Sequence, residues 1–406
     1  MLTTRRNAAK ILAAGALASS VAVPAARAAS GTGSATFDVA VIGAGAFGVW
    51  TAHAFRQMGQ RVCLIDEYGA AHSRASSGGE SRIIRTAYGK QAIYSRWAME
   101  SLVEWKALEA RNATLLFEPT GVLAIAPTSD SFLNDTVKAL VALGVPHDLL
   151  DAADVARRFP AFHLGQNEGA VFEPRSGALL ARHAIQTLVA ELVASGMDYR
   201  TAAVRTPTGS GALPAIVTQN GETISAGRYV FACGPWLPKV FPEVIGARVE
   251  PQRAEVFFLG IPAGSAAFDP AVMPTWMDQY GVAGAYGFPD LEARGCKVAV
   301  DPAPILVDPD TQSRLVTQPF IDLMREFVAF RFPALARAPI VETRVCQYEM
   351  ARDEEYILDR HPAFDNVWIA GGGSGHGFKN GPRVGRYMAQ VITGAVTPDP
   401  RFTVSR

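Results

Sequence analysis

The stretch FDVAVIGAGAFG at residues 37–48 decides the fold. Its apolar start predicts a buried strand, a G-x-G-x-x-G turn follows, and residues 49–58 predict a helix. In such a turn Gly43 lets the chain bend, Gly45 lets a pyrophosphate approach the backbone, and Gly48 lets the helix pack on the strand. The unpaired N–H groups and the positive dipole end of the helix then stabilise phosphate.

A second predicted strand at residues 61–65 ends at Asp66, about 20 residues past the turn, where a ribose hydroxyl needs an acceptor. A glycine triplet alone also occurs in other α/β proteins. The order of strand, turn, helix, strand and acid is more specific, and it predicts dinucleotide binding. The turn does not distinguish FAD from NAD, so the rest of the chain has to.

Composition limits the function further. The chain has 406 residues, enough for one to three domains, and its 38 Lys and Arg balance its 38 Asp and Glu. Without a basic surplus no nucleic-acid partner is expected. The cysteines Cys63, Cys233, Cys296 and Cys346 show no metal-ligand spacing, so no metal site is expected. Cys63 and Cys233 lie in apolar strand patterns and are expected in the core.

Residues 1–28 have the pattern of a signal peptide. Arg5-Arg6 precede an apolar run at 11–23, and Ala26-Arg27-Ala28 forms an A-x-A cleavage site. The run is short for a membrane span, and the arginine pair resembles a twin-arginine signal. We therefore expect export to the periplasm with no membrane segment after cleavage; the alternative is a cytoplasmic protein with a flexible arm.

The rest of the chain mixes helical and strand patterns. Helices are predicted near residues 94–111, 131–143, 183–195, 320–330 and 382–393, strands near 121–125, 169–174, 229–236 and 367–370, and an Asn-Gly hairpin at 218–223. The strand at 229–236 is expected beside the first strand. The glycine-rich run at 371–379 can place backbone amides against a flavin ring or its ribityl chain.

Arg82 and Arg85 follow small residues that would admit a flat ligand. Three positions apart, the two arginines share one face if their segment is helical. The alternative is the end of a surface helix whose charges are solvated.

Several longer motifs follow in a fixed order. They are SRIIRTAYG at 81–89, FEPRSG at 172–177, YGFP at 286–289, Cys346 with YILDRHP at 356–362, and GSGHGFK at 373–379. With these motifs the chain resembles the D-amino-acid-oxidase superfamily, in the branch of monomeric sarcosine oxidase and N-methyltryptophan oxidase. The resemblance covers nearly all of the chain after the leader.

The resemblance implies an α/β fold in which a Rossmann-like FAD-binding domain is interleaved with a mixed-sheet substrate domain. We expect the FAD-binding domain at residues 36–118, 175–248 and 342–398, and the substrate domain at 119–174 and 249–341. The resemblance also implies that Cys346 carries FAD through a thioether. The alternative for Cys346 is a buried free thiol.

The same resemblance assigns the residues of the substrate site. Arg85 and Lys379 would pair with a substrate carboxylate, which accepts charge-assisted hydrogen bonds. Arg82 would lie near the flavin as a fixed cation, and Lys297 would lie near the ring face that activates oxygen. Tyr286 would line the substrate pocket. The alternatives are a strand-edge lysine for Lys297 and core packing for Tyr286.

The cofactor contacts form a larger set. We expect them at Gly43, Gly45, Phe47, Gly48, Asp66, Arg82, Val204, Gly234, Trp236, Cys346, Gly375, His376, Gly377 and Lys379. His376 is expected as a turn residue near the flavin, not as a base. The chain departs from the sarcosine branch at Gly78 and Asp301, where that branch has histidines. Asp301 could face the pocket and hold a cationic part of the substrate; the alternative is a solvated turn aspartate.

These assignments predict an FAD-dependent oxidase of a secondary or N-methyl amine, such as an amino acid. The amine becomes an imine that water hydrolyses, and O2 becomes hydrogen peroxide. A fructosyl-amino-acid or cyclic imino-acid oxidase would share every motif. A flavin dehydrogenase that uses a quinone or another carrier would also be compatible with the sequence, as would a flavin-binding module without catalysis. We expect a monomer.

Overall fold

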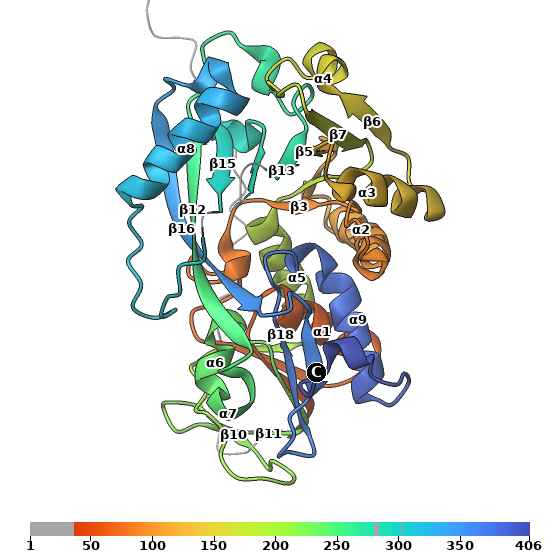
Figure 1. Cartoon of the computed structure of the whole chain (residues 1–406). Helices are drawn as coiled ribbons and strands as arrows, with labels where there is room; N and C mark the ends of the chain where they lie inside the picture. The colour runs from red at the N-terminus through yellow and green to blue at the C-terminus, as the bar shows by residue number, and fades with distance from the viewer. Residues whose placement is uncertain (1–35, 280–283, 302) are drawn as a thin grey trace, which may run out of the picture.

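The computed structural model describes residues 36–279, 284–301 and 303–406, so the predicted leader lies outside the described residues. Two large sheets occupy opposite halves of the molecule, and β3 of a small third sheet lies near the middle (Figure 1). The long strands β12 (Val249–Leu259) and β16 (Ile340–Ala351) pair side by side and run from one half toward the other.

The first sheet has the order β17-β18-β11-β1-β2-β9, with β10 paired to β11. Its strands are β1 (Thr36–Ile42), β2 (Val62–Asp66), β9 (Asp198–Thr201), β10 (Ile216–Val217), β11 (Thr223–Phe231), β17 (Ile357–Arg360) and β18 (Val367–Gly371). From β18 to β9 every neighbouring pair is parallel. The carboxyl ends of these strands therefore meet at one edge, where ligands bind in open α/β sheets.

Both faces of this sheet are covered, which explains the continuous apolar run of β1. Val39 and Val41 face the helices α1 (Ala46–Gln57), α2 (Ala92–Asn112), α5 (Ala181–Ala194) and α9 (Gly381–Ile392). Ala40 and Ile42 face the opposite layer, which includes the short helices α6 (Leu237–Val240) and α7 (Pro242–Ile245). The strand alternation thus assigns successive residues of β1 to two different cores.

The second sheet is mixed and has the order β16-β12-β15-β14-β13-β5-β7-β6. Its other strands are β5 (Val122–Pro127), β6 (Asp148–Asp151), β7 (Glu168–Glu173), β13 (Thr275–Asp278), β14 (Ala285–Phe288) and β15 (Cys296–Val300). Only β13 and β5 pair in parallel among the described strands of this sheet. Helix α8 (Gln318–Arg331) packs on it through Phe320, Met324 and Val328.

The other elements are short or peripheral. They are α3 (Ser131–Ala142), α4 (Ala152–Arg158), the third sheet of β3 (Arg82–Ile84), β4 (Phe117–Glu118) and β8 (Gly177–Leu179), and single 3₁₀ turns at Ser76–Gly78, Gly234–Trp236, Ala266–Phe268, Leu291–Ala293, Pro333–Leu335, Phe378–Asn380 and Pro400–Phe402. Within the described ranges, no helix is long and apolar enough to cross a membrane.

The structure confirms the α/β class, the mixed second sheet and the pairing of β11 with β1. Arg82 and Arg85 would share one face if their segment were helical, and the structure does not meet that condition. Arg82 begins strand β3, which pairs with β8, and residues three apart on an extended chain point to opposite sides. The two arginines therefore serve different parts of the site.

We expect Gly48→Ala to lower the free energy of unfolding by about 1–3 kcal/mol, because a Cβ there would lie 1.9 Å from the Gly43 carbonyl oxygen. Helix propensity alone predicts the opposite sign, since alanine is favoured over glycine in a helix. Urea denaturation measures the change. Gly165→Ala is the control: its Cβ would come no closer than 3.5 Å to the Glu168 carboxylate, and we expect a change within about 0.5 kcal/mol. Equal or higher stability of Gly48→Ala would contradict the packing argument.

Candidate active site

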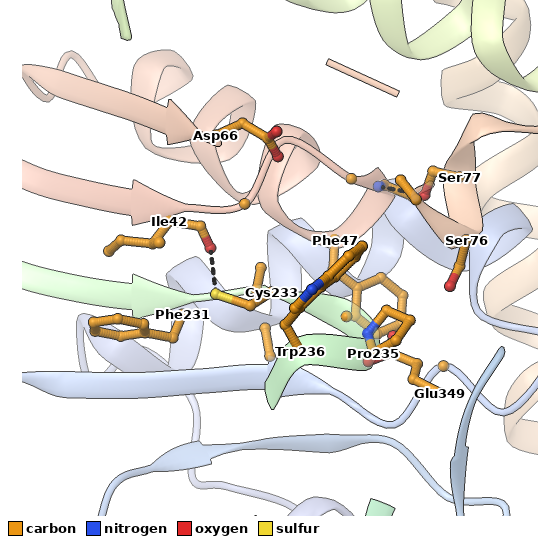
Figure 2. Close-up of a pocket in the computed structure, with 18 of the residues that line it drawn as sticks. Ile42, Phe47, Asp66, Ser76, Ser77, Phe231, Cys233, Pro235, Trp236 and Glu349 are labelled. Carbon is orange, nitrogen blue, oxygen red and sulfur yellow. Dashed lines mark hydrogen bonds between the residues drawn. The ribbon is translucent and has the colours of Figure 1, made fainter. Parts of the chain in front are cut away.

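A cavity of about 260 Å³ opens at the carboxyl ends of the parallel strands (Figure 2). Its wall combines the turn after β1, Asp66 at the end of β2, the turn after β11 and the glycine-rich run after β18. These segments are far apart in the sequence and meet because their strands are neighbours in the sheet. The cavity is therefore long enough to contact one ligand at several strands.

The glycines of the first turn lie where a side chain would clash or would face the cavity, as their predicted roles require. Gly43 has a φ of +110°, and a Cβ there would lie 2.2 Å from the Ala232 carbonyl oxygen. At Gly45 a Cβ would have no protein atom closer than Ser77 Oγ at 3.4 Å, so the backbone is open toward the cavity. Helix α1 begins directly after Gly45, which has no side chain to cap it, and the first N–H group, that of Ala46, donates to Ser77 Oγ at 3.0 Å. This arrangement suits an anionic ligand at the helix N-terminus.

Asp66 lines the cavity as predicted and also holds the surrounding loops. Its Oδ2 accepts from Ala44 N–H at 2.8 Å, and its Oδ1 accepts from the N–H groups of Tyr68 and Gly69, both at 2.9 Å. The carboxylate thus connects the first glycine turn to the loop after β2. Its remaining lone pairs face the cavity where a ribose hydroxyl is expected.

The predicted cofactor residues divide into two groups. Gly43, Gly45, Phe47, Asp66, Arg82, Val204, Gly234, Trp236, Gly375 and Gly377 line the cavity, whereas Gly48, Cys346, His376 and Lys379 lie outside its lining. At Gly375, with φ of +70°, a Cβ would meet nothing within 4 Å. This second glycine turn therefore leaves space on the cavity side, as the first one does.

Many residues of the cavity wall were not predicted, and Glu349 and Tyr348 are the ones with a chemical role to explain. Glu349 and Tyr348 line the cavity from β16. Their only sequence signal is their place within three residues of Cys346. Cys233 was expected in the core but lines the cavity, with its Sγ 3.6 Å from the Ile42 carbonyl oxygen (Figure 2). Cys233 is the residue before the turn at Gly234–Trp236, and it packs partly buried against the sheet core while it lines the cavity.

Cys346 lies next to the cavity, in the second sheet. It is buried as a free thiol and packs with Tyr286 and Tyr348, whose hydroxyl oxygens are 3.1 Å apart. Asp301 is near the same tyrosines: burial raises the pKa of its carboxyl to about 7, against a hydrogen bond with Tyr348 that lowers it. Asp301 is therefore not a solvated turn residue. Arg82 is close to the thiol and lines the cavity itself.

Lys297 is buried in β15, between β12 and β14, so it is not a strand-edge lysine. Its Nζ lies 3.1 Å from Ser81 Oγ and 3.8 Å from Glu80 Oε2. Burial and the nearby Arg82 lower the pKa of Lys297 to about 8, although Glu80 opposes the shift. The Lys297 side chain is therefore still mostly protonated at neutral pH, and it loses its proton as the pH rises through about 8.

Arg85 and Lys379 come together on one buried aromatic ring. The Arg85 guanidinium lies 4.3 Å from the centre of the Tyr88 ring, and Lys379 Nζ lies 5.3 Å from it. Lys379 Nζ also donates to Tyr88 Oη at 3.0 Å and to the His376 carbonyl at 3.2 Å. Burial, and then Arg85, lower the pKa of Lys379 well below its ordinary range. Arg85 Nη1 is buried and has no hydrogen-bond partner among the described residues.

Two supporting side chains fix this cation pair. Glu173 accepts from the N–H groups of Thr86 and Ala87, both at 2.8 Å, and so holds the chain between Arg85 and Tyr88. His376 is a turn residue, as predicted, with its Nδ1 2.9 Å from Tyr356 Oη. Burial, then Lys379, lower its pKa to about 3, so the imidazole is neutral. An anion is the missing partner of the two cations.

A dinucleotide cavity with buried cations and a thiol beside one end defines a nucleotide-dependent oxidoreductase. Among such enzymes, the chain belongs to the DAO family of FAD dependent oxidoreductases, whose family model matches residues 38–391. It is therefore an FAD-dependent amine oxidoreductase. The residues fit the cofactor, because the backbone is open toward the cavity at Gly45 and Gly375 and a buried oxygen of Glu349 has no partner among the described residues.

Two oxidases of related sequence and one solved structure are similar to this chain over most of its length. Monomeric sarcosine oxidase of Bacillus sp. (strain B-0618) is 31% identical over 377 residues, which cover 91% of this chain and 96% of the relative. N-methyl-L-tryptophan oxidase of Yersinia pestis (strain Pestoides F) is 27% identical over 87% of this chain and 94% of the relative. Glycine oxidase from Geobacillus kaustophilus shares the fold with a TM-score of 0.74 at 18% identity, covering 91% of this chain and 99% of that structure.

We expect Glu80→Gln to destabilise the protein by about 3 kcal/mol, because Glu80 is the buried anion shared by Lys297, Arg294 and Arg344. Burial raises the pKa of Glu80, but these cations outweigh it and leave the pKa below 4.5. The stabilisation is therefore present above that pH and is lost as the pH falls through the folded-state pKa. Urea denaturation at neutral and acidic pH measures both effects.

Glu342→Gln is the matched control for this prediction. Glu342 pairs with the same Arg294 at 2.6 Å, but its side chain is 35% exposed, so we expect a loss below about 1 kcal/mol. Equal losses for the two variants would contradict the importance of the buried cluster.

Proposed function

We propose that the protein oxidises the C–N bond of a secondary or N-methyl amino acid and transfers the electrons to O2. The observation that carries the proposal is the pair of buried cations, Arg85 and Lys379, on the Tyr88 ring. A carboxylate between them would accept charge-assisted hydrogen bonds, including one from the unpartnered Arg85 Nη1. It would also restore the pKa of Lys379, since an anion favours the charged ammonium.

FAD, when bound, accepts two electrons and a proton equivalent from the amine carbon and nitrogen and passes them on to O2. Overall the amine loses two electrons and two protons to become an imine, O2 gains both to become hydrogen peroxide, and water hydrolyses the imine. Arg82 provides a fixed cation at the cavity wall, which stabilises negative charge that develops there. Lys297, held by Ser81 and Glu80, provides an ammonium that stabilises the negative charge that develops on O2 as it is reduced.

The covalent link through Cys346 is part of the proposal. Two neighbours of the thiol, Arg82 and Tyr348, line the dinucleotide cavity. The sulfur of Cys346 would therefore lie close to FAD bound in the cavity, as a thioether requires. We further propose that the leader at 1–28 directs the monomeric enzyme to the periplasm. Export of the folded chain would allow FAD to be loaded first.

The covalent link predicts that flavin colour stays in the pellet when the purified protein is precipitated with acid. Cys346→Ser should release the colour into the supernatant while the fold is kept, because serine replaces one atom of a buried side chain. Visible absorbance of pellet and supernatant gives the result. Cys296→Ser, a change of another buried thiol, is the control and should retain pelleted flavin. Colour found only in the supernatant of the wild type would refute the thioether.

The reaction predicts that N-methyl amino acids bleach the flavin without oxygen and release peroxide when oxygen is admitted. Fructosyl amino acids and cyclic imino acids in the same panel separate the related oxidases. Reduced enzyme that does not react with oxygen but reduces a dye would indicate a dehydrogenase, and failure of every amine to bleach the flavin would contradict catalysis.

Asp301 predicts a selectivity among these substrates. The kcat/KM for substrates with a basic side chain should increase as the pH rises through about 7 and the carboxyl of Asp301 ionises.

Asp301→Asn should remove this pH-dependent gain and lower kcat/KM for basic substrates about tenfold, the worth of one hydrogen bond to a charged group. Neutral substrates should change little, and they serve as the internal control. Unchanged selectivity in Asp301→Asn would show that the acid does not face the substrate.

A further inference from the structure

Glu349 has a feature that the amine chemistry does not use. Its carboxyl faces the cavity, and its Oε2 is buried without a hydrogen-bond partner among the described residues (Figure 2). The side chain lies against the turn after β18: a Cβ at Gly373 would be 3.0 Å from Oε1, and one at Gly371 would be 3.3 Å from Oε2. A side chain at Gly373 would crowd this carboxyl, and the hydrogen-bonding capacity of its buried Oε2 is unused among the described residues.

The protonation of Glu349 follows from its surroundings. Burial raises the pKa of the carboxyl to about 7, while the backbone amides of Gly373 and Gly372 lower it in part. Below that pH the group is a neutral acid with one O–H donor and one acceptor oxygen. A buried acid with an unsatisfied oxygen is costly, so a ligand group that supplies both a donor and an acceptor would stabilise it.

The sheet order shows which part of a dinucleotide lies here. Along the carboxyl edge the order is β18, β11, β1 and β2, with Glu349 at the turn after β18 and Asp66 at the end of β2. Three strand spacings, about 14 Å, separate the end of β2 from the turn after β18, against which Glu349 packs from β16. Pyrophosphate belongs at the glycine turn after β1 and the adenosine ribose near Asp66. The part of FAD on the other side of the pyrophosphate, the ribityl chain, therefore falls toward Glu349.

We propose that Glu349 is a cofactor-binding residue that recognises a ribityl hydroxyl of FAD as a neutral acid. Its O–H donates to the hydroxyl and its other oxygen accepts from it. Ionisation removes the donor and places a buried negative charge beside a ligand that already carries a diphosphate. FAD binding is therefore coupled to the proton on this carboxyl.

Other titratable groups face the same cavity. They are Tyr348 from β16, Cys233 after β11, Arg82 from β3, Lys239 from α6, Asp66 at the end of β2, and Glu67, Tyr68 and His72 after β2. Burial raises the pKa values of Tyr348 and Cys233 and lowers that of His72 from 6.5, which moves all three away from a transition near 7. Asp301, whose carboxyl also has a pKa raised to about 7 by burial, is hydrogen-bonded to Tyr348 but lies outside the cavity lining. Loss of the pH dependence in Glu349→Gln therefore distinguishes titration of Glu349 from titration of Asp301.

The test measures FAD affinity, not turnover. Cys346→Ser apoprotein is titrated with FAD over a range of pH, and flavin fluorescence gives the Kd. We expect the Kd to rise as the pH increases above about 7, approaching the limit of about tenfold per pH unit that one coupled proton allows. Adding Glu349→Gln, which keeps one donor and one acceptor but does not titrate, should hold the Kd near its low-pH value at every pH. Adding Glu349→Leu should weaken binding about tenfold at low pH.

Two controls keep the result specific. Glu67→Gln changes another acid of the cavity, at the far end, and should leave the pH dependence intact. ADP, which has the diphosphate but no ribityl chain, should bind with the same Kd to the Cys346→Ser protein and to its Glu349→Leu variant. The same pH dependence in Glu349→Gln, or equal losses of ADP and FAD affinity in Glu349→Leu, would overturn the proposal without affecting the proposed amine oxidation.

Discussion

Buried positive charge that the protein itself only partly neutralises is the constraint on which the site depends. Lys297 has Glu80 at 3.8 Å, but Lys379 and Arg85 share a tyrosine ring, and neither forms an ion pair with a carboxylate of the described residues. Desolvation makes such cations costly unless an anion completes them. Arg85 Nη1 is left without a hydrogen-bond partner among the described residues, so an anion bound beside it would stabilise the site.

Strand β3 divides this charge between two tasks. Because its chain is extended, Arg82 points to the cavity and the thiol of Cys346, while Arg85 reaches the ring of Tyr88. A helix would have placed both arginines on one side, where they would repel each other and serve a single ligand. Strand β3 and the residue that follows it therefore place one cation at the cavity and the other on the Tyr88 ring.

Local chemistry explains what could be predicted from the sequence. The roles of Gly43, Gly48 and Asp66 follow from a turn that any dinucleotide fold needs, and the structure places them accordingly. Pairing across the sheet is not local. Strand β3 is an extended segment because β8, nearly a hundred residues later, pairs with it, and no periodicity within residues 81–89 contains that information. Glu349 was missed for the same reason, since its importance comes from the glycines of a distant turn.

The two cavity acids, Asp66 and Glu349, are similar groups that differ in their hydrogen-bonding roles because their surroundings differ. Asp66 already accepts three backbone N–H bonds, so it acts as an acceptor that also fixes the loops. Glu349 has less compensation for its burial, and the pKa of its carboxyl rises to about 7. Polyol hydroxyls can both donate and accept, which a neutral acid matches better than a carboxylate does. Burial of Glu349 thus favours the neutral acid, while the backbone amides of Gly372 and Gly373 oppose that shift in part.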